Sequence, residues 1–548
     1  MSLASVNLLV FREDRRCVAG RTLKAELLRA CDGCEGPEST LRALLRAGEL
    51  ECGVADAVPE LAAAWQKITD RLADAFLSPQ PLPRLDFLCA SIQQAAAPDV
   101  VAISKPEGFS YYALHPLGYA DALQRLPDIS SNIAVIGIRS IGTTLSAIVT
   151  AAARKRGASV SRITVRPVGH PYDRHVQFTP EQRAWIGTAM AEEAGFLVVD
   201  EGPGLSGSSF ISVGEALLQM GAPGEKITLI CGHQPDLNSL RAPNGSSRAR
   251  QFRWIAVNSQ TRRPSGAAVF AGGGEWRRFV LGNESEWPAS WTNFERLKYW
   301  PPSPEGEPRL FKFAGFGHYG DAVIRREEKI ASAGFGPKPR TESDGFASYP
   351  WVQGTPMRAA DLSAGVLARL AAYCAFRAQA FPSEMEGISA LQRMAEHNLQ
   401  ELRFDLPVSL RLQRPVIADS RMQPHEWLLT PAGQVLKTDS GSHGDDHFFP
   451  GPTDIAWDLA GAIVEWRMPR AQADFFLGSY RVASGDDPSQ RLGDYLKAYA
   501  AYRCAYCIMA GNALQGGPEA LRMERAAANY GALLLQFREA GQVIGSSS

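Results

Sequence analysis

The sequence predicts a mixed protein: an α/β unit built on a Rossmann-like parallel sheet, followed by an α+β unit. Between residues 96 and 290, short wholly apolar runs alternate with helical segments, as in a parallel sheet covered on both faces. After residue 290 this pattern changes to short strands and long helical stretches. A chain of 548 residues is also too long for one core. We expect an accessory segment over 1–95, an α/β domain over 96–290 and a second domain over 291–548.

Composition indicates an ordinary globular protein, with 45% hydrophobic and 21% charged residues. A net charge of -1 gives no global field that attracts nucleic acid or an anionic membrane. The first residues show no basic-then-apolar leader, and no apolar run reaches membrane-spanning length. Nine scattered cysteines suit a reducing compartment better than a disulfide framework. We expect a cytoplasmic protein that binds small molecules, not nucleic acid or membrane; its oligomeric state stays open.

The expected elements follow from hydrophobic spacing. In the accessory segment, residues 6–11 predict a strand, and residues 41–45 and 61–76 have helical spacing. A proline-rich stretch, 79–83, separates this segment from the α/β domain. There we expect strands at 133–138, 161–165, 196–200 and 227–231, and helices at 143–156 and 211–220.

Two adjacent carboxylates, Asp200 and Glu201, end the third apolar strand. Ligands of parallel sheets bind beyond the carboxyl ends of the strands. A loop of small residues follows and opens a helix, where backbone N–H groups and serine hydroxyls can hold a phosphate. The two acids suit the hydroxyls of an attached sugar better. The candidate phosphate ligands are Gly204, Ser206, Gly207, Ser208 and Ser209.

This run resembles the binding signature for phosphoribosyl pyrophosphate (PRPP) in type I phosphoribosyltransferases. The resemblance implies that PRPP is the donor substrate, that Mg²⁺ accompanies it, and that Asp200 and Glu201 are catalytic at the ribose. By the same comparison, Arg139, Ser140 and Gly142 look like the loop that holds the pyrophosphate.

Two features of this domain allow more than one interpretation. Four residues, not the usual three, separate the acidic pair from the Ser-Gly step, and an ordinary turn between strand and helix is the alternative. Residues 166–174 follow the second strand and are rich in turn residues and cations. They are either a mobile loop that closes over a pyrophosphate or an ordinary solvated loop.

The second domain has one lysine and several carboxylates at the ends of expected strands and on helices. A strand over 309–313 contains an inward lysine, and a helix over 321–333 contains two adjacent glutamates. Two later apolar runs each end in a carboxylate, and another carboxylate lies on the helix that follows. In chain order these candidates are Lys312, Glu327, Glu328, Asp419, Asp439 and Asp458.

This order resembles the bilobal aminoglycoside-phosphotransferase and protein-kinase-like fold. The resemblance implies that Lys312 binds the ATP phosphates and that Glu327 or Glu328 orients it. Asp419 would be the catalytic carboxylate that positions the acceptor hydroxyl, and Asp439 the one that holds Mg²⁺ against the phosphates.

The match departs from the family pattern in two places. The glycines follow Lys312 instead of preceding it, and the metal-binding asparagine expected after Asp419 is absent, with Pro424 and His425 in that region. Mg²⁺ prefers oxygen ligands. His425 and Asp439 are therefore candidate ligands of a transition metal, or else charges of a surface loop.

Taken together, these patterns predict a bifunctional small-molecule transferase. The first half would transfer phosphoribose from PRPP, and the second would use ATP to phosphorylate a small hydroxylated molecule or the ribosyl product. The alternative is a regulatory protein that senses PRPP or a nucleotide, with one or both domains catalytically degenerate.

Overall fold

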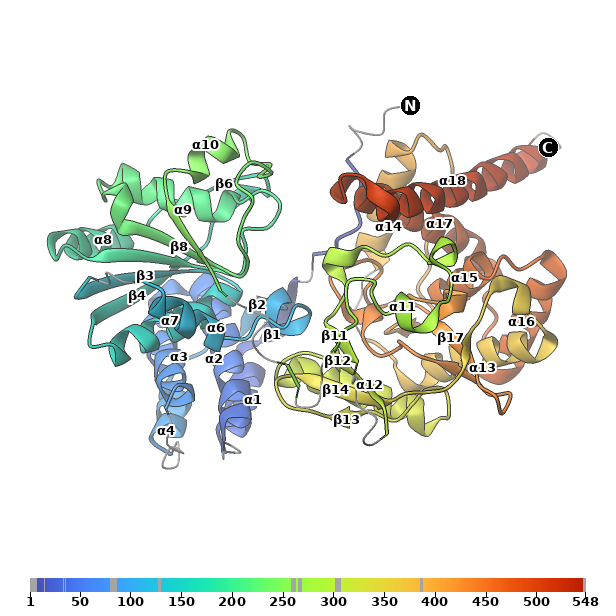
Figure 1. Ribbon diagram of the computed structural model, residues 1–548, viewed down its shortest axis with the longest axis horizontal. Coiled ribbons are helices and arrows are strands. Elements are labelled where there is room, and N and C mark those ends of the chain that lie inside the picture. Colours follow the sequence, from blue (N-terminus) through green and yellow to red (C-terminus); the bar gives the residue numbers. More distant parts are fainter. Residues whose placement is uncertain are drawn as a thin grey trace.

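The structure is a computed structural model that describes residues 7–13, 15–32, 34, 36–78, 86–126, 130–257, 263–264, 269–300, 307–384 and 388–545. It is a mixed α/β protein (Figure 1), with a parallel sheet on the left of the view and a largely helical part on the right. The expected parallel sheet is confirmed.

Five parallel strands form the sheet of the first half in the order β4-β3-β7-β8-β9. The strand order reverses between β3 and β7, and ligands of open α/β sheets bind at such a reversal. The strands are β3 (Asn132–Ile138), β4 (Ser159–Val165), β7 (Gly195–Val199), β8 (Ile227–Cys231) and β9 (Arg253–Ala256).

Alternate residues of β3 face two apolar cores, which explains its unbroken apolar sequence. Ile133 and Val135 pack with helices α2, α3 and α7, whereas Ala134 and Ile136 pack with α8 and α9. The bounds are α2 (Pro37–Ala57), α3 (Ala62–Phe76), α7 (Ile141–Lys155), α8 (Pro180–Ala191) and α9 (Ser208–Gln219). The first 95 residues therefore cover one face of the sheet.

A buried charge cluster also joins these N-terminal helices to the sheet. The guanidinium of Arg162 on β4 binds Glu51 of α2 at 2.9 and 3.0 Å and Asp70 of α3 at 2.7 Å. The remaining elements here are β1 (Arg15–Ala19), α1 (Gly20–Asp32), α4 (Asp86–Gln94), β2 (Val100–Ser104), α5 (Glu107–Ser110), α6 (Leu117–Gln124), β5 (Val168–His170), β6 (Asp173–His175) and α10 (Gly245–Ala249).

The second half begins with an antiparallel five-stranded sheet in the order β10-β11-β12-β14-β13 and the helix α12 (His318–Ser332). Its strands are β10 (Val269–Phe270), β11 (Lys298–Trp300), β12 (Arg309–Phe313), β13 (Arg340–Thr341) and β14 (Phe346–Pro350). Residues 351–354 connect this sheet to the helical part without regular structure.

The helical part consists of long helices and short antiparallel ladders. The helices are α13 (Ala364–Ala380), α14 (Ile388–Glu401), α15 (Ala456–Glu465), α16 (Arg470–Ser484), α17 (Ser489–Ala513) and α18 (Gly517–Gly545). In one ladder β17 (Trp427–Leu429) lies between β15 (Thr355–Pro356) and β18 (Val435–Lys437), and in the other β16 (Pro415–Val416) pairs with β19 (Thr453–Asp454). Within the described chain, no helix has the length and apolar character that a bilayer span requires.

The prediction of a strand over residues 6–11 was wrong. Residue 6 lies outside the described residues, and residues 7–10 form no strand; Phe11 makes a single bridge to Phe448. The Leu9 N–H instead donates to Asn398 Oδ1 at 2.8 Å, so this segment packs on α14 of the second half.

The two halves of the chain contact each other at several places. Arg42 of α2 forms an ion pair with Asp321 of α12, and Lys105 Nζ lies 2.5 Å from Asp445 Oδ1. Apolar residues of both halves also share one core, which extends from the parallel sheet to β11, β12 and β14. The first half therefore supports the antiparallel sheet directly.

Candidate functional site

A cavity of about 450 Å³ lies between the antiparallel sheet and the helical part. Charged side chains from both parts reach its wall, together with many aromatic rings. Its wall includes Tyr111, Trp276, Trp291, Phe294, Lys298, Leu310, Lys312, Glu327, Tyr349, Trp351, Arg421, His425, Glu426, Leu428, Asp439, His443, Asp446, Glu465, Arg503 and Tyr506. A volume of this size suits a nucleotide or another small molecule.

Lys312 and Asp439 meet on the wall of this cavity. Lys312 Nζ forms an ion pair with Asp439 Oδ1 and donates to Ser442 Oγ at 3.2 Å, and Lys298 Nζ lies 3.7 Å from Asp439 Oδ2. Burial lowers the pKa of Lys312, and the charge of Asp439 opposes that shift. Burial disfavours the ionised form of Asp439, but His443, Lys312 and Lys298 together outweigh burial and hold the pKa of Asp439 well below the ordinary value. Asp439 is therefore ionised.

Of the two adjacent glutamates on α12, only Glu327 faces the cavity. Its Oε1 accepts the Gly441 N–H at 2.7 Å, and its Oε2 accepts the Ser440 hydroxyl at 3.1 Å. A side chain at Gly441 would clash with Glu327, because an added Cβ would lie 2.6 Å from it. Glu328 is exposed. Glu327 thus fixes the backbone that follows Asp439.

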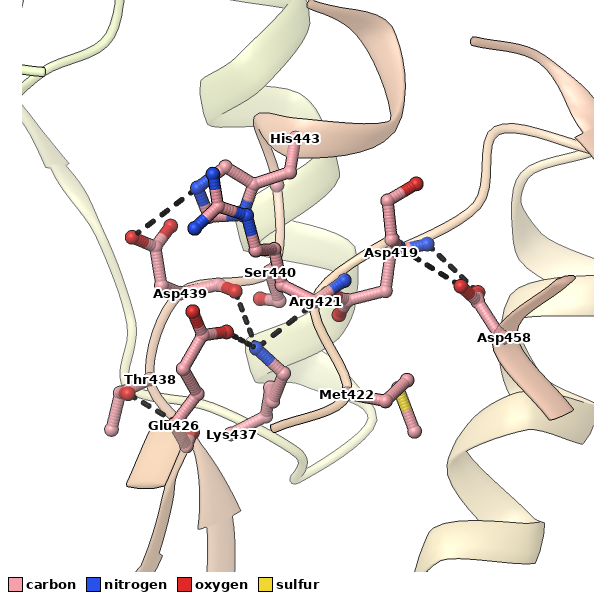
Figure 2. A network of polar contacts seen from close by, with 12 residues as sticks. Asp419, Arg421, Met422, Glu426, Lys437, Thr438, Asp439, Ser440, His443 and Asp458 are labelled. Carbon is pink, nitrogen blue, oxygen red and sulfur yellow. Dashed lines mark hydrogen bonds and ion pairs between the residues drawn. The ribbon is translucent and has the colours of Figure 1, made fainter. Parts of the chain in front are cut away.

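Asp458 fixes the loop that carries Asp419. Its carboxylate accepts the backbone N–H groups of Asp419 at 2.8 Å and Ser420 at 2.9 Å, as Figure 2 shows. The Asp419 carboxylate itself is fully buried and accepts the hydroxyl of Tyr373. It lies 3.7 Å from Arg377 and does not reach the cavity wall.

Asp419, Glu426 and His443 are the one group in the described chain whose potential metal-ligand atoms lie within 4.8 Å of one another. This group does not fit Mg²⁺, because it includes an imidazole and an ammonium already lies against it. Lys437 Nζ is 2.7 Å from Glu426 Oε2 and 3.6 Å from Asp419 Oδ1 (Figure 2). Asp439, an ionised carboxylate on the cavity wall, does fit Mg²⁺, which needs only one or two carboxylates beside phosphate oxygens.

The structure does not bring the two expected transition-metal ligands into such a group. His425 instead stacks on Trp276, with ring centroids 5.9 Å apart. Burial, and then the charges of Lys437 and Arg421, lower the pKa of His425 to about 3. His425 is therefore a neutral ring on the aromatic wall.

In the first half, Asp200 lies where β3 and β7 end side by side. Its carboxylate accepts the N–H groups of Gly142 and Glu201, and burial raises its pKa to about 7. A Cβ at Gly142 would lie 2.6 Å from the Val199 oxygen, so only glycine permits this approach. Ser140, just before α7, has φ 120° and ψ -122°, a strained conformation of the kind found at binding sites.

The loop after Asp200 turns at Gly204 and Gly207, both with positive φ. The hydroxyls of Ser206 and Ser208 donate to the Pro171 oxygen at 2.8 and 2.7 Å. Pro171 lies between β5 and β6, so the hairpin formed by residues 168–175 contacts the loop. Ser209 is half-buried, on the first turn of α9.

Two expected ligands of this site point elsewhere. Arg139 pairs with Asp56 of α2, Nη1 to Oδ1 at 3.1 Å, and not with the 200–209 loop. Glu201 accepts the Gly108 N–H, and burial raises its pKa well above the ordinary value. The structure therefore joins Asp200 to the Gly142 loop but turns Arg139 and Glu201 toward other elements.

Sequence reasoning missed Lys437 and Glu426 beside Asp419, and Lys298 beside Asp439. A lysine within a short apolar strand, two residues before a carboxylate, was the available signal for Lys437. Lys298 lies on β11, opposite Lys312 on β12, and only the strand pairing shows this.

No protein-family model and no curated protein matches this sequence. Similar solved structures include a choline kinase from Streptococcus pneumoniae, with 14% identity, a TM-score of 0.27 and coverage of 43% of this chain and 90% of that chain. An ethanolamine kinase from Plasmodium vivax has 11% identity, a TM-score of 0.30 and coverage of 44% and 78%. A macrolide 2'-phosphotransferase from Brachybacterium faecium has 14% identity, a TM-score of 0.30 and coverage of 43% and 88%.

Proposed function

We propose that the cavity of the second half binds ATP with Mg²⁺ and serves phosphoryl transfer to a small hydroxylated molecule. The contact between Lys312 and Asp439 carries this proposal. Phosphoryl transfer needs a cation beside the phosphates and a carboxylate that holds the metal, and this ion pair supplies both on one wall.

Each residue has a definite task in this proposal. Lys312 exchanges Asp439 for phosphate oxygens when the nucleotide enters, and Asp439 is the residue that would hold Mg²⁺. Mg²⁺ bound at Asp439 would neutralise the negative charge of the phosphates. Glu327 and Asp458 hold the two backbone loops in place and do not touch the nucleotide.

Calorimetric titration with a non-hydrolysable ATP analogue and Mg²⁺ tests this function. The wild-type protein should bind the analogue, and Lys312→Met should weaken binding roughly tenfold or more, since a charge-assisted contact is lost. Lys338→Met changes an exposed lysine and is the matched control. Equal affinities in all three proteins would contradict the proposal.

The burial of Asp419 favours a second candidate, nucleotide binding without transfer. The resemblance assigns Asp419 to the acceptor hydroxyl, yet the carboxylate lies behind the cavity wall. A nucleotide sensor needs no such carboxylate. Formation of ADP with hydroxylated acceptors would exclude this candidate, whereas tight ATP binding without turnover would support it.

For the first half we propose binding of PRPP at the strand-order reversal. The approach of Gly142 to Asp200 supports this, because it joins the two loops that the resemblance assigns to pyrophosphate and ribose. Binding requires that Ser206 and Ser208 exchange the Pro171 oxygen for phosphate. Asp200→Asn should abolish pyrophosphate release from PRPP, while the exposed Asp474→Asn should not. Unchanged release in Asp200→Asn would refute this role.

A further inference from the structure

One end of the large cavity is lined by arginines with unused donors. Arg421 is half-buried, and its guanidinium makes no hydrogen bond or ion pair with any described residue. Arg503 lines the same cavity with a side chain only 12% exposed. Arg467, exposed, lies on the rim. A partly buried guanidinium without a counter-ion is costly and calls for an anion.

The polar contacts that orient the Arg503 side chain are made by its Nε. Nε lies 3.3 Å from Glu465 Oε1 and donates to the Tyr530 hydroxyl at 3.2 Å. The terminal nitrogens of Arg503 have no hydrogen-bond partner among the described residues, and its guanidinium lies 5.3 Å from the ring centre of Tyr506. Because Nε fixes the group, its terminal N–H donors remain available to a ligand.

The loop before Arg421 is also fixed. Ser420 has φ 66°, a left-handed conformation that serine rarely adopts, and Asp458 accepts its N–H. Figure 2 shows the Arg421 side chain running from this loop toward His443. Such strain persists only where the surroundings enforce it and is common at ligand sites.

The carboxylates around this end already have other partners. Glu426 binds Lys437 at 2.7 Å, and Asp446 accepts the Phe448 N–H at 2.8 Å. Glu465 Oε1 accepts two tyrosine hydroxyls, each at 2.7 Å, in addition to Arg503. Arg503 therefore shares the Glu465 carboxylate with two tyrosines, and Arg421 has no ion-pair partner among the described residues, so terminal N–H donors of both remain available to a ligand.

An aromatic wall lies beside the arginines. The rings of Trp291 and Phe294 are 4.7 Å apart, and Tyr506 packs 5.3 Å from Trp291. All three rings line the cavity. Such a wall suits an apolar or ring-shaped portion of a ligand.

We propose that Arg421 and Arg503 form an anion subsite that binds a phosphate or carboxylate group of the phosphoryl acceptor. The planar forks of two guanidinium groups match both oxyanions. The acceptor is then an anionic hydroxylated small molecule, with its apolar portion against Trp291 and Tyr506. This substrate class rests on the function proposed for the same cavity.

Titration calorimetry without nucleotide tests the subsite. Ribose 5-phosphate represents the phosphate source, gluconate the carboxylate source, and uncharged ribose is the control ligand. At least one of the anions should bind, and ribose should not. Arg421→Gln and Arg503→Gln should each weaken anion binding roughly tenfold or more, since each removes charge-assisted hydrogen bonds. Arg470→Gln, on a side chain that is 97% exposed, should leave it unchanged.

A parallel titration with the ATP analogue separates the two proposals. Retained analogue binding in Arg503→Gln, together with lost anion binding, supports the subsite. Analogue binding without binding of either anion overturns the subsite and leaves the nucleotide proposal standing. Anion binding that survives both arginine substitutions also overturns it. Circular dichroism of each variant should match wild type, so that loss of folding is not taken for loss of a ligand contact.

Discussion

At the scale of single residues, Asp200 is a buried carboxylate that favours its protonated form. Burial raises its pKa to about 7, above the 3.8 of an ordinary aspartate. The folded protein therefore binds this proton more tightly than the unfolded chain does. Its contribution to stability is greatest below about pH 4 and is lost as the pH rises toward 7.

Replacing Asp200 by asparagine should remove this pH-dependent loss. The Tm of Asp200→Asn, relative to wild type, should increase between pH 4 and pH 7 by on the order of a few degrees and then level off. Differential scanning fluorimetry across this range measures it, with Asp474→Asn as the exposed control. A difference in Tm that does not vary with pH would show that Asp200 ionises normally.

The resemblance to the kinase-like fold indicated Lys312 and Asp439 as residues of one site. It did not indicate the side chains that surround them. The type and order of charged residues along a chain can indicate such a pair. Strand pairing brings Lys298 to Asp439 and Lys437 to Glu426. Asp56 pairs with Arg139 and holds it away from its expected loop. Lys298 and Asp56 are distant in sequence from the residues that they contact, and Lys437 lies within a short apolar strand. Only the tertiary packing shows that these side chains meet their partners.

At the scale of elements, the buried face of α12 positions the backbone that follows Asp439, by way of the Glu327 carboxylate. Glu327 accepts hydrogen bonds from Gly441 and Ser440, whereas its neighbour Glu328 faces solvent. Glu327→Ala should weaken binding of the ATP analogue roughly tenfold, because a buried N–H loses its acceptor and the loop is freed. Glu328→Ala should bind like wild type. Equal weakening in both variants would contradict this role for α12.

Elements could be predicted where the local pattern was complete. The apolar runs of β3, β7 and β8 indicated strands, since both faces of a parallel sheet are buried. Residues 7–11 have a strand-like pattern too, but their backbone binds Asn398 of α14 instead of a neighbouring strand. Whether such a segment pairs in a sheet depends on a partner that the local sequence does not contain.

At the scale of the whole molecule, the two halves share an apolar core and several polar contacts. Tyr111 of the first half lines the cavity of the second half, and the Tyr112 hydroxyl lies within hydrogen-bond distance, 3.2 Å, of Nε2 of His447, a residue of the cavity wall. Because one apolar core contains residues of both halves, we expect one cooperative unfolding transition in differential scanning calorimetry. Two well-separated transitions would show that the halves unfold independently.

Hydrogen–deuterium exchange, measured with and without the ATP analogue and Mg²⁺, locates the nucleotide-binding site in the chain. Mg²⁺ and the analogue should slow exchange in residues 309–313, 349–354 and 437–446, which surround Lys312 and Asp439. Unchanged exchange in all three segments, with protection only around residues 139–144 and 200–209, would contradict this location of the site.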